Sequence, residues 1–277
     1  MKQFNTPILF IAFNRPDLTK LVFEEIRKVK PREFFVSVDG PRNEEERKNV
    51  EEVRKIVSNV NWPCKLKKKF NKINLGCRKA ESSAMTWFFD NVHEGIVLED
   101  DCLPGHDFFI FCEEMLKKYK NDERIMHISG NNFLGNKKKE DSSYYFSKYP
   151  FSWGWASWKR SWKKYDVDMK LYPKIKKEKY LKNNFPLLEE LSIKSAFDAT
   201  YKGLDTWDYQ WFFALLINKG LAIIPNKNLV KNIGFGRDST HTKKIDSHYS
   251  IPIERINFPL RPPLVVAWNK EYDKAYF

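Results

Sequence analysis

The sequence predicts an α/β protein with a mostly parallel central sheet and helices on both faces. Within its 277 residues, short apolar segments rich in β-forming residues alternate with longer segments of helical pattern. This alternation is typical of βαβ units, in which consecutive strands lie parallel in one sheet. Ligands of such sheets bind at the carboxyl ends of the strands. We therefore expect the functional residues in the loops that follow the strands.

The predicted elements follow one another closely in the first part of the chain. Pro16 suits the first turn of a helix, and Asp39-Gly40-Pro41 is a turn sequence after the second apolar segment. In chain order we predict a strand over residues 7–12, a helix from Pro16, a strand over 33–38, a helix over 43–57, a strand over 64–70, a helix over 78–91 and a strand over 95–98. After about residue 130 the alternation ends, and one clear helix is predicted over residues 207–218.

The composition is that of a globular protein with an anionic partner. Hydrophobic residues make up 42% of the chain, and 49 Lys and Arg against 36 Asp and Glu give a net charge of +13. Nucleic acid, an anionic membrane surface and a phosphate-bearing substrate would each attract such a chain. The lysine runs at 67–69, 137–139 and 174–179 are scattered, which favours a solvated surface, then peripheral membrane contact. No nucleic-acid-binding motif accompanies them, so we expect no nucleic-acid partner.

The cysteines and the N-terminus predict a cytoplasmic protein, with the inner face of the membrane as a second location. Four cysteines without a C-x-x-C pair are too few for a disulfide scaffold in a chain of this length. The first residues lead directly into a strand-like segment without a signal-peptide pattern, and no apolar run approaches the length of a membrane span.

The strongest local signal is the triplet Glu99-Asp100-Asp101 at the end of a predicted buried strand. Adjacent carboxylates repel one another unless a cation joins them, and Mg²⁺ and Mn²⁺ prefer oxygen ligands from carboxylates and substrate phosphates. The triplet therefore predicts a metal and nucleotide site. An acidic turn without a ligand is the alternative.

Asp208 opens the predicted helix over residues 207–218 and allows two interpretations. An acid in the first turn interacts favourably with the helix dipole, with Thr206 or Asp205 as N-cap and Trp207, Trp211 and Leu215 as a core stripe. Alternatively, a carboxylate between aromatic walls could accept a proton from an attacking hydroxyl group.

Two further segments are candidates for donor binding. Residues 232–242 combine Gly234 and Gly236 with groups that can donate to phosphate, among them Ser239, and with His241, a candidate metal ligand. A polar surface loop is the alternative, because no P-loop pattern is present. Residues 151–158 are rich in tryptophan, including Trp155, and predict either core packing or a wall on which sugars stack.

In this order, the segments resemble the GT-A glycosyltransferases, and within them the inverting N-acetylglucosaminyltransferases that initiate complex N-glycans and related bacterial sugar transferases. The resemblance covers roughly residues 7–242. It implies that the donor is bound by three loops that follow strands, by the acidic triplet, by the tryptophan segment and by the glycine-containing loop. The nucleotide-sugar residues that it implies are Phe13, Asn14, Arg15, Asp39, Gly76, Arg78, Glu99, Asp100, Trp155 and Ser239.

The resemblance also implies the roles of the remaining site residues. Asp101 corresponds to the aspartate that binds Mn²⁺ or Mg²⁺, with His241 as a second ligand, and Asp208 corresponds to the catalytic base. The loop that includes residues 236–241 would order over the donor diphosphate. We expect a single domain over 1–277, with the nucleotide sugar bound by 1–130 and the acceptor and catalytic base in 131–277.

The implied activity is metal-dependent transfer of a sugar, with inversion, from a UDP-linked and GlcNAc-like donor to a hydroxyl group of a glycan or lipid-linked glycan. A retaining transferase would use the same metal site without needing Asp208. A non-catalytic basic binding module is a further alternative. A nucleotidyltransferase is less favoured, because residues 12–16 contain no glycine after the first strand.

Overall fold

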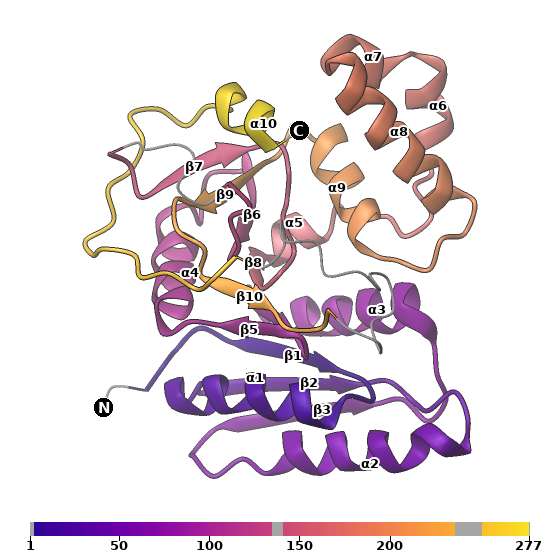
Figure 1. The fold of residues 1–277 in the computed structure, drawn as a ribbon, viewed down its shortest axis with the longest axis vertical. Coiled ribbons are helices and arrows are strands. Elements are labelled where there is room, and N and C mark those ends of the chain that lie inside the picture. Colours follow the sequence, from indigo (N-terminus) through magenta and orange to yellow (C-terminus); the bar gives the residue numbers. More distant parts are fainter. Residues whose placement is uncertain (1–2, 135–140, 236–250, 277) are drawn as a thin grey trace.

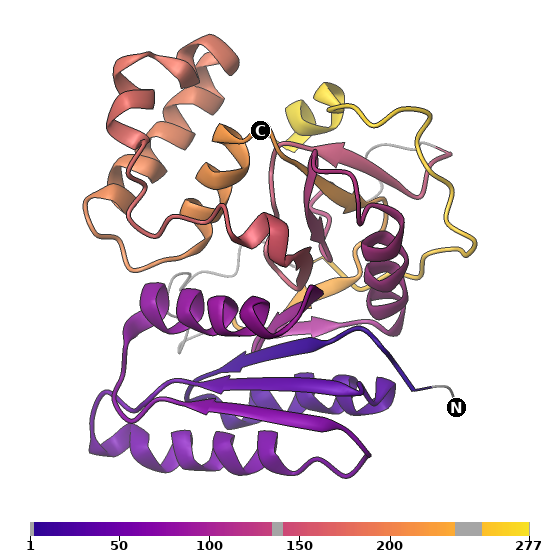
Figure 2. The same ribbon diagram turned by 180° about the vertical axis from the view of Figure 1, so that it is seen from behind.

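The computed structural model, which describes residues 3–134, 141–235 and 251–276, confirms the α/β class. Eight strands form one central sheet in the order β3-β2-β1-β4-β8-β6-β9-β7 (Figure 1). Strands from residues 1–130 and from 131–277 share this sheet. Helices cover both of its faces, as the view from behind also shows (Figure 2).

As far as residue 99 the chain forms the elements that the sequence predicts, with bounds that differ by at most two residues, and three elements that the sequence does not predict follow over 102–129. Asn43 caps α2, because its side chain accepts a hydrogen bond from the backbone N–H of Glu46 at 3.0 Å. In order, the elements are β1 (Ile8–Ala12), α1 (Pro16–Val29), β2 (Glu33–Val38), α2 (Glu44–Ser58), β3 (Lys65–Phe70), α3 (Gly76–Asn91), β4 (Glu94–Glu99), β5 (Cys102–Pro104), α4 (His106–Lys118) and β6 (Ile125–Ser129).

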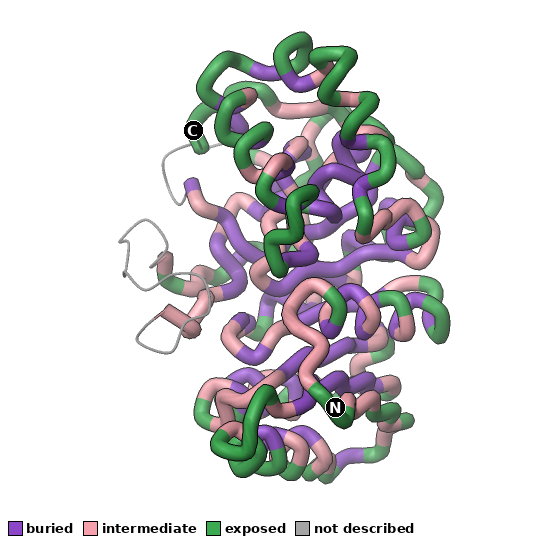
Figure 3. Tube along the Cα trace, turned by 90° about the vertical axis from the view of Figure 1, so that its right-hand side faces the viewer, coloured by how far each residue is buried: buried purple, intermediate pink, exposed green. Residues whose placement is uncertain are grey.

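The second part contains more helices than the sequence predicts. Its elements are β7 (Tyr144–Ser147), β8 (Trp155–Trp158), α5 (Lys159–Trp162), α6 (Tyr172–Lys177), α7 (Tyr180–Asn184), α8 (Leu187–Tyr201), α9 (Asp208–Ile217), β9 (Leu221–Pro225), β10 (Val230–Asn232) and α10 (Lys270–Tyr276). Helix α8 escapes prediction because Leu187, Leu188 and Leu191 point outward, so its apolar residues do not mark a single buried face. Figure 3 shows the exposed outer surface of this helical region.

The sheet is parallel in its first part and mixed beyond it. Strands β3, β2, β1 and β4 pair in parallel, and β6 pairs in parallel with β9. Strand β8 runs antiparallel between β4 and β6, and β7 runs antiparallel to β9. The prediction of a mostly parallel sheet therefore holds for four of seven pairings. The alternation rule cannot detect β8, because no helical crossover precedes it.

Alternate residues of the parallel strands enter two hydrophobic cores. Ile8 and Phe10 pack with residues of α1, α2 and α4 on one face, whereas Leu9 and Ile11 pack with residues of α3 and α9 on the other. Burial on both faces explains why these strands appear in the sequence as continuous apolar runs. The four cysteines are free, as the sequence predicts. Among the described residues, no helix is both long enough and apolar enough to cross a membrane.

The tryptophan-rich segment belongs to the core. Trp155 is 1% exposed and stacks against Trp207 at a ring distance of 5.5 Å and against His127 at 5.1 Å. Trp207, Trp211 and Leu215 are also buried, as the predicted core stripe requires. The donor contact predicted for Trp155 is therefore not available here, because no face of its ring is open. Trp155 therefore has a packing role, because other aromatic rings surround it.

Candidate active site

The acidic triplet meets an arginine at the carboxyl end of β4. Because β1 and β4 are parallel neighbours, the loop after β1 places Arg15 beside the triplet. The Arg15 guanidinium pairs with Asp100, and its Nη1 lies 3.1 Å from Oδ2 of Asp101. Asp100, 3% exposed, also accepts a hydrogen bond from the backbone N–H of Phe13 at 3.2 Å. Residues predicted to share a site, 85 positions apart, are thus in direct contact.

A second, smaller sheet brings the chain around residue 234 to the same place. Strand β10 pairs antiparallel with β5, and the backbone N–H of Ile233 donates to the carbonyl oxygen of Asp101 at 2.8 Å. A Cβ atom on Gly234 would lie 2.5 Å from Oδ2 of Asp101 and 2.9 Å from Nη1 of Arg15. Glycine is required here because the backbone passes directly over this ion pair. The predicted diphosphate loop therefore begins beside the carboxylates.

Glu81, on the inner side of α3, belongs to the same cluster although the sequence did not single it out. Its Oε1 accepts a hydrogen bond from the Cys77 thiol at 3.2 Å. Burial raises the pKa of Glu81, and the charges of Asp101, Asp208 and Asp100 raise it further. Burial and the charge of Glu81 likewise raise the pKa of Glu99 well above its usual range. These carboxyl groups lie close enough to oppose one another's ionisation.

Asp208 reaches the cluster from the second part of the chain, held by its neighbour Asp205. The Asp205 carboxylate accepts hydrogen bonds from the backbone N–H groups of Cys77 at 3.0 Å and Arg78 at 2.8 Å, at the N-terminus of α3. Asp208 then begins α9 and accepts hydrogen bonds from the Thr206 hydroxyl and, at 2.9 Å, from the backbone N–H of Tyr209. The N-cap of α9 is Trp207, so the prediction of Thr206 or Asp205 is wrong. Asp205 serves α3 instead.

Asp39 organises the loop between β3 and α3. Its carboxylate accepts hydrogen bonds from the side-chain amides of Asn71 and Asn74, both at 2.9 Å, and from the backbone N–H of Leu75. It is buried at the carboxyl end of β2, next to the ends of β1 and β3. Gly76 follows with φ +76°, where a Cβ atom would meet the Asp205 carboxylate at 2.8 Å. Both residues therefore shape the wall of the site.

The remaining predicted donor residues have local partners. Asn14 donates to Glu46 at 2.9 Å, and the guanidinium of Arg42 lies over the Phe13 ring at 5.3 Å. Arg78 donates to the carbonyl oxygen of Val167. Ser239 and His241 lie outside the described residues. Among the residues that are described, no three His, Cys, Asp or Glu side chains are arranged to hold a metal ion.

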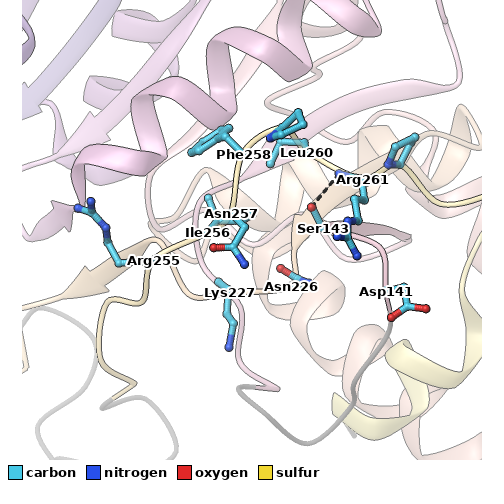
Figure 4. Close-up of a pocket in the computed structure, with 12 residues that line it drawn as sticks. Asp141, Ser143, Asn226, Lys227, Arg255, Ile256, Asn257, Phe258, Leu260 and Arg261 are labelled. Carbon is cyan, nitrogen blue, oxygen red and sulfur yellow. Dashed lines mark hydrogen bonds between the residues drawn. The ribbon is translucent and has the colours of Figure 1, made fainter.

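A separate cavity of about 500 Å³ lies under the extended segment that follows residue 254. Figure 4 shows the residues that line it, including Lys227 and Asn257, and the backbone N–H of Arg261 donates to the Ser143 hydroxyl at 2.9 Å. None of the predicted site residues that the structure describes lines this cavity. We place the site at the acidic cluster, because ionisable groups from the loop after β1, from α3, from the end of β4 and from α9 converge there.

The sequence alone offers little signal for Glu81. A glutamate within a helix is ordinarily read as a solvent-facing residue. Met85, four residues later, is buried but gives the inner face of α3 only a weak apolar pattern. Its role depends on how α3 lies against β1 and β4, which the sequence does not specify. The only hint is its spacing of one helical turn from Cys77.

Comparisons with known proteins identify no family. No protein-family model matches the chain, and no curated protein matches it. An inositol-1-phosphate CTP transferase from T. maritima is 12% identical, with a TM-score of 0.42, over 90% of this chain and 95% of that chain. The galactosyltransferase LgtC, solved with donor and acceptor sugar analogues, is 12% identical, with a TM-score of 0.35, over 76% and 70%. Mouse xyloside xylosyltransferase 1 is 10% identical, with a TM-score of 0.35, over 76% and 81%. Nothing about activity follows from likenesses this weak.

Proposed function

We propose that this protein is a GT-A glycosyltransferase that transfers a sugar from a nucleotide diphosphate sugar to an acceptor hydroxyl group. The observation that carries the proposal is the convergence of Arg15, the acidic triplet and Asp208 at the carboxyl ends of parallel strands. This is where ligands of α/β sheets bind. Buried carboxyl groups that raise one another's pKa also favour a site that binds a cation or transfers a proton over a purely structural cluster.

The proposed reaction is a single displacement at the anomeric carbon. Asp208 takes the proton from the acceptor hydroxyl as that oxygen bonds to the anomeric carbon, and the bond to the leaving diphosphate breaks. Arg15 and donors of the loop from Gly234 onward would face the diphosphate as its charge grows. Attack on the face opposite the leaving group inverts the configuration. A retaining reaction remains the second candidate, and the anomer of the product distinguishes the two.

We further propose that the site takes a divalent cation of the Mn²⁺ or Mg²⁺ kind. Asp101 is the ligand that we propose, with His241 as the second, because carboxylate oxygens are preferred by hard cations and Asp101 is partly accessible. Such an ion would neutralise charge on the leaving diphosphate. The raised pKa values of Glu81 and Glu99 fit this assignment, since a cation would relieve the repulsion within the cluster.

A panel of nucleotide sugars tests the proposed function. With the true donor at about 100 times its Kd, ligand binding should raise the free energy of unfolding by about 2.7 kcal/mol, which is read as a higher Tm. We expect the rise to require Mn²⁺ or Mg²⁺, and we expect a UDP-linked sugar to give the largest one. Release of the nucleoside diphosphate on adding glycan acceptors would then establish transfer. If no nucleotide sugar raises the Tm with either metal, the result would favour a non-catalytic binding module over a transferase.

For the acceptor, we propose a glycan or lipid-linked glycan reached at an anionic membrane surface. Helices α7 and α8 meet at a corner where Leu187, Leu188 and Leu191 are 67%, 76% and 51% exposed. Exposed Lys182 and Lys194 lie close to them in the chain. Leucines that enter the lipid interface, with lysines that face anionic headgroups, are the chemistry of peripheral binding.

Vesicle flotation tests this surface. We expect the protein to float with vesicles that contain phosphatidylglycerol and not with phosphatidylcholine alone. Changing the three leucines to serine together should lower the bound fraction at least about tenfold, because their apolar area is lost. Changing exposed Leu264 and Val265 to serine is the matched control. If the leucine variant floats normally, or changes only the oligomeric state, the membrane assignment is wrong.

A further inference from the structure

One carboxyl oxygen of the cluster is left without a partner. Glu81 lies on α3 one turn beyond Cys77, whose thiol donates to Oε1. Its Oε2 is buried and makes no hydrogen bond to any described residue. Buried polar atoms are almost always paired in folded proteins, and exceptions call for an explanation.

Three of its acidic neighbours have partners in the structure. Asp100 is held by Arg15 and the N–H of Phe13, and Asp101 by Arg15. Both donors to Asp208 reach its Oδ1. Glu81 differs from these three residues, because its Oε2 is buried and has no partner among the described residues, although a carboxyl oxygen can accept a hydrogen bond.

The position of Glu81 favours the transferred sugar as its partner. Glu81 accepts from the thiol of Cys77, and the backbone N–H of Cys77 donates to Asp205, three residues before the proposed base. Helix α3 also packs against β4, whose end carries the proposed metal ligand. In a displacement at the anomeric carbon, the sugar must lie between the leaving diphosphate and the attacking hydroxyl. A sugar presents hydroxyl and amide groups that can donate to a carboxyl oxygen, whereas an ionised diphosphate presents only acceptor oxygens.

We propose that Glu81 is a specificity residue for the donor, whose Oε2 hydrogen-bonds one hydroxyl or amide group of the transferred sugar. This inference rests on the proposed glycosyltransferase function. Glu81 would not take part in bond formation or cleavage. It would select among sugars, because a site built to bond a polar group rejects a donor that lacks that group.

The test compares Glu81→Ala and Glu81→Gln with the wild type on one series of donors. The series contains the nucleotide sugar that the wild type uses and its analogues that each lack one polar group of the sugar. Glu113→Ala is the matched control, because Glu113 is also partly buried in a helix and accepts one hydrogen bond, from Thr6 at 3.2 Å, outside the cluster. The affinity for the free nucleoside diphosphate is measured in parallel.

We expect Glu81→Ala to lower kcat/KM for the intact donor about tenfold. For one analogue, the wild type should show a similar loss and Glu81→Ala no further loss, because the same bond is missing in both. Affinity for the nucleoside diphosphate should be unchanged. Glu81→Gln should stay within about threefold of the wild type, since an amide can also donate and accept.

Two outcomes would overturn the role of Glu81 while leaving the transferase proposal intact. One is that Glu81→Ala lowers kcat/KM equally for all donors, and the other is that it has no effect. If Glu81→Ala does not fold, Glu81→Leu, which also removes the hydrogen-bonding group, takes its place, and an equal loss for all donors or no loss would likewise overturn the role. Failure of the wild type to use any nucleotide sugar contradicts the transferase proposal itself, and this inference with it.

Discussion

Asp208→Asn should lower sugar transfer by about 10² to 10⁴-fold while the protein keeps its fold and its donor affinity. The two hydrogen bonds that Asp208 accepts both end on Oδ1. An asparagine can keep both through its own Oδ1, so the local geometry at the start of α9 is retained. What it loses is the ability to take a proton from the acceptor hydroxyl. Initial rates with saturating donor, together with the Tm, would measure the two properties separately.

A role limited to the helix terminus makes a different prediction. An acid in the first turn contributes about 0.3 to 1 kcal/mol to stability and little to rate. Asp17→Asn provides the matched control, because Asp17 is the acidic residue in the first turn of α1 and lies outside the cluster. Near wild-type transfer by Asp208→Asn would remove it as the base. A product anomer that matches the donor would then favour the retaining reaction.

Asp101→Asn is expected to abolish the metal-dependent part of the activity, a loss of at least about 10²-fold, because a metal ion contributes several kcal/mol to charge stabilisation. Asparagine removes the negative charge that a divalent cation prefers and weakens the contact with Arg15 at 3.1 Å. Titration with Mn²⁺, followed by the initial rate, would show whether the loss comes from metal affinity. We expect saturation to shift to much higher metal concentration.

The control for Asp101 is Asp90→Asn, which makes the same charge change on the exposed surface of α3. It should leave both the rate and the metal titration unchanged. If Asp101→Asn retains normal Mn²⁺-dependent turnover, Asp101 is not the metal ligand. Glu99 would then be the next carboxylate to test, because it belongs to the same triplet and the charges of Asp101 and Asp208 act on it.

The sequence predicts the first part of the fold well because its signals there are local. Strands buried on both faces give unbroken apolar runs, Pro16 marks the start of α1, and Asn43 caps α2. The rule that strand ends share one edge then predicts that Arg15 and the triplet are neighbours, which the ion pairs confirm. The proposed roles of these residues in donor binding remain predictions.

Features that depend on packing between distant segments could not be predicted. Glu81 enters the site only because α3 lies against β1 and β4, and Asp205 caps a helix that begins 129 positions earlier in the chain, at Gly76. Trp155 has the composition of a sugar-stacking wall, but the rings around it fill the core. In each case the residue type permits two roles, and only the position of its neighbours decides between them.

The antiparallel insertion of β8 between β4 and β6 has a consequence for synthesis of the chain. The ribosome releases β4 and β6 before β8, yet these two strands are joined in the sheet only through β8. A nascent chain that ends before Trp155 therefore carries an open hydrogen-bonding edge on β4, and open edges of this kind favour pairing with other chains. The joining of β4 to β6 must wait for Trp155–Trp158, which are made after both strands. An arrest or truncation before that point leaves the acidic cluster on an unfinished scaffold.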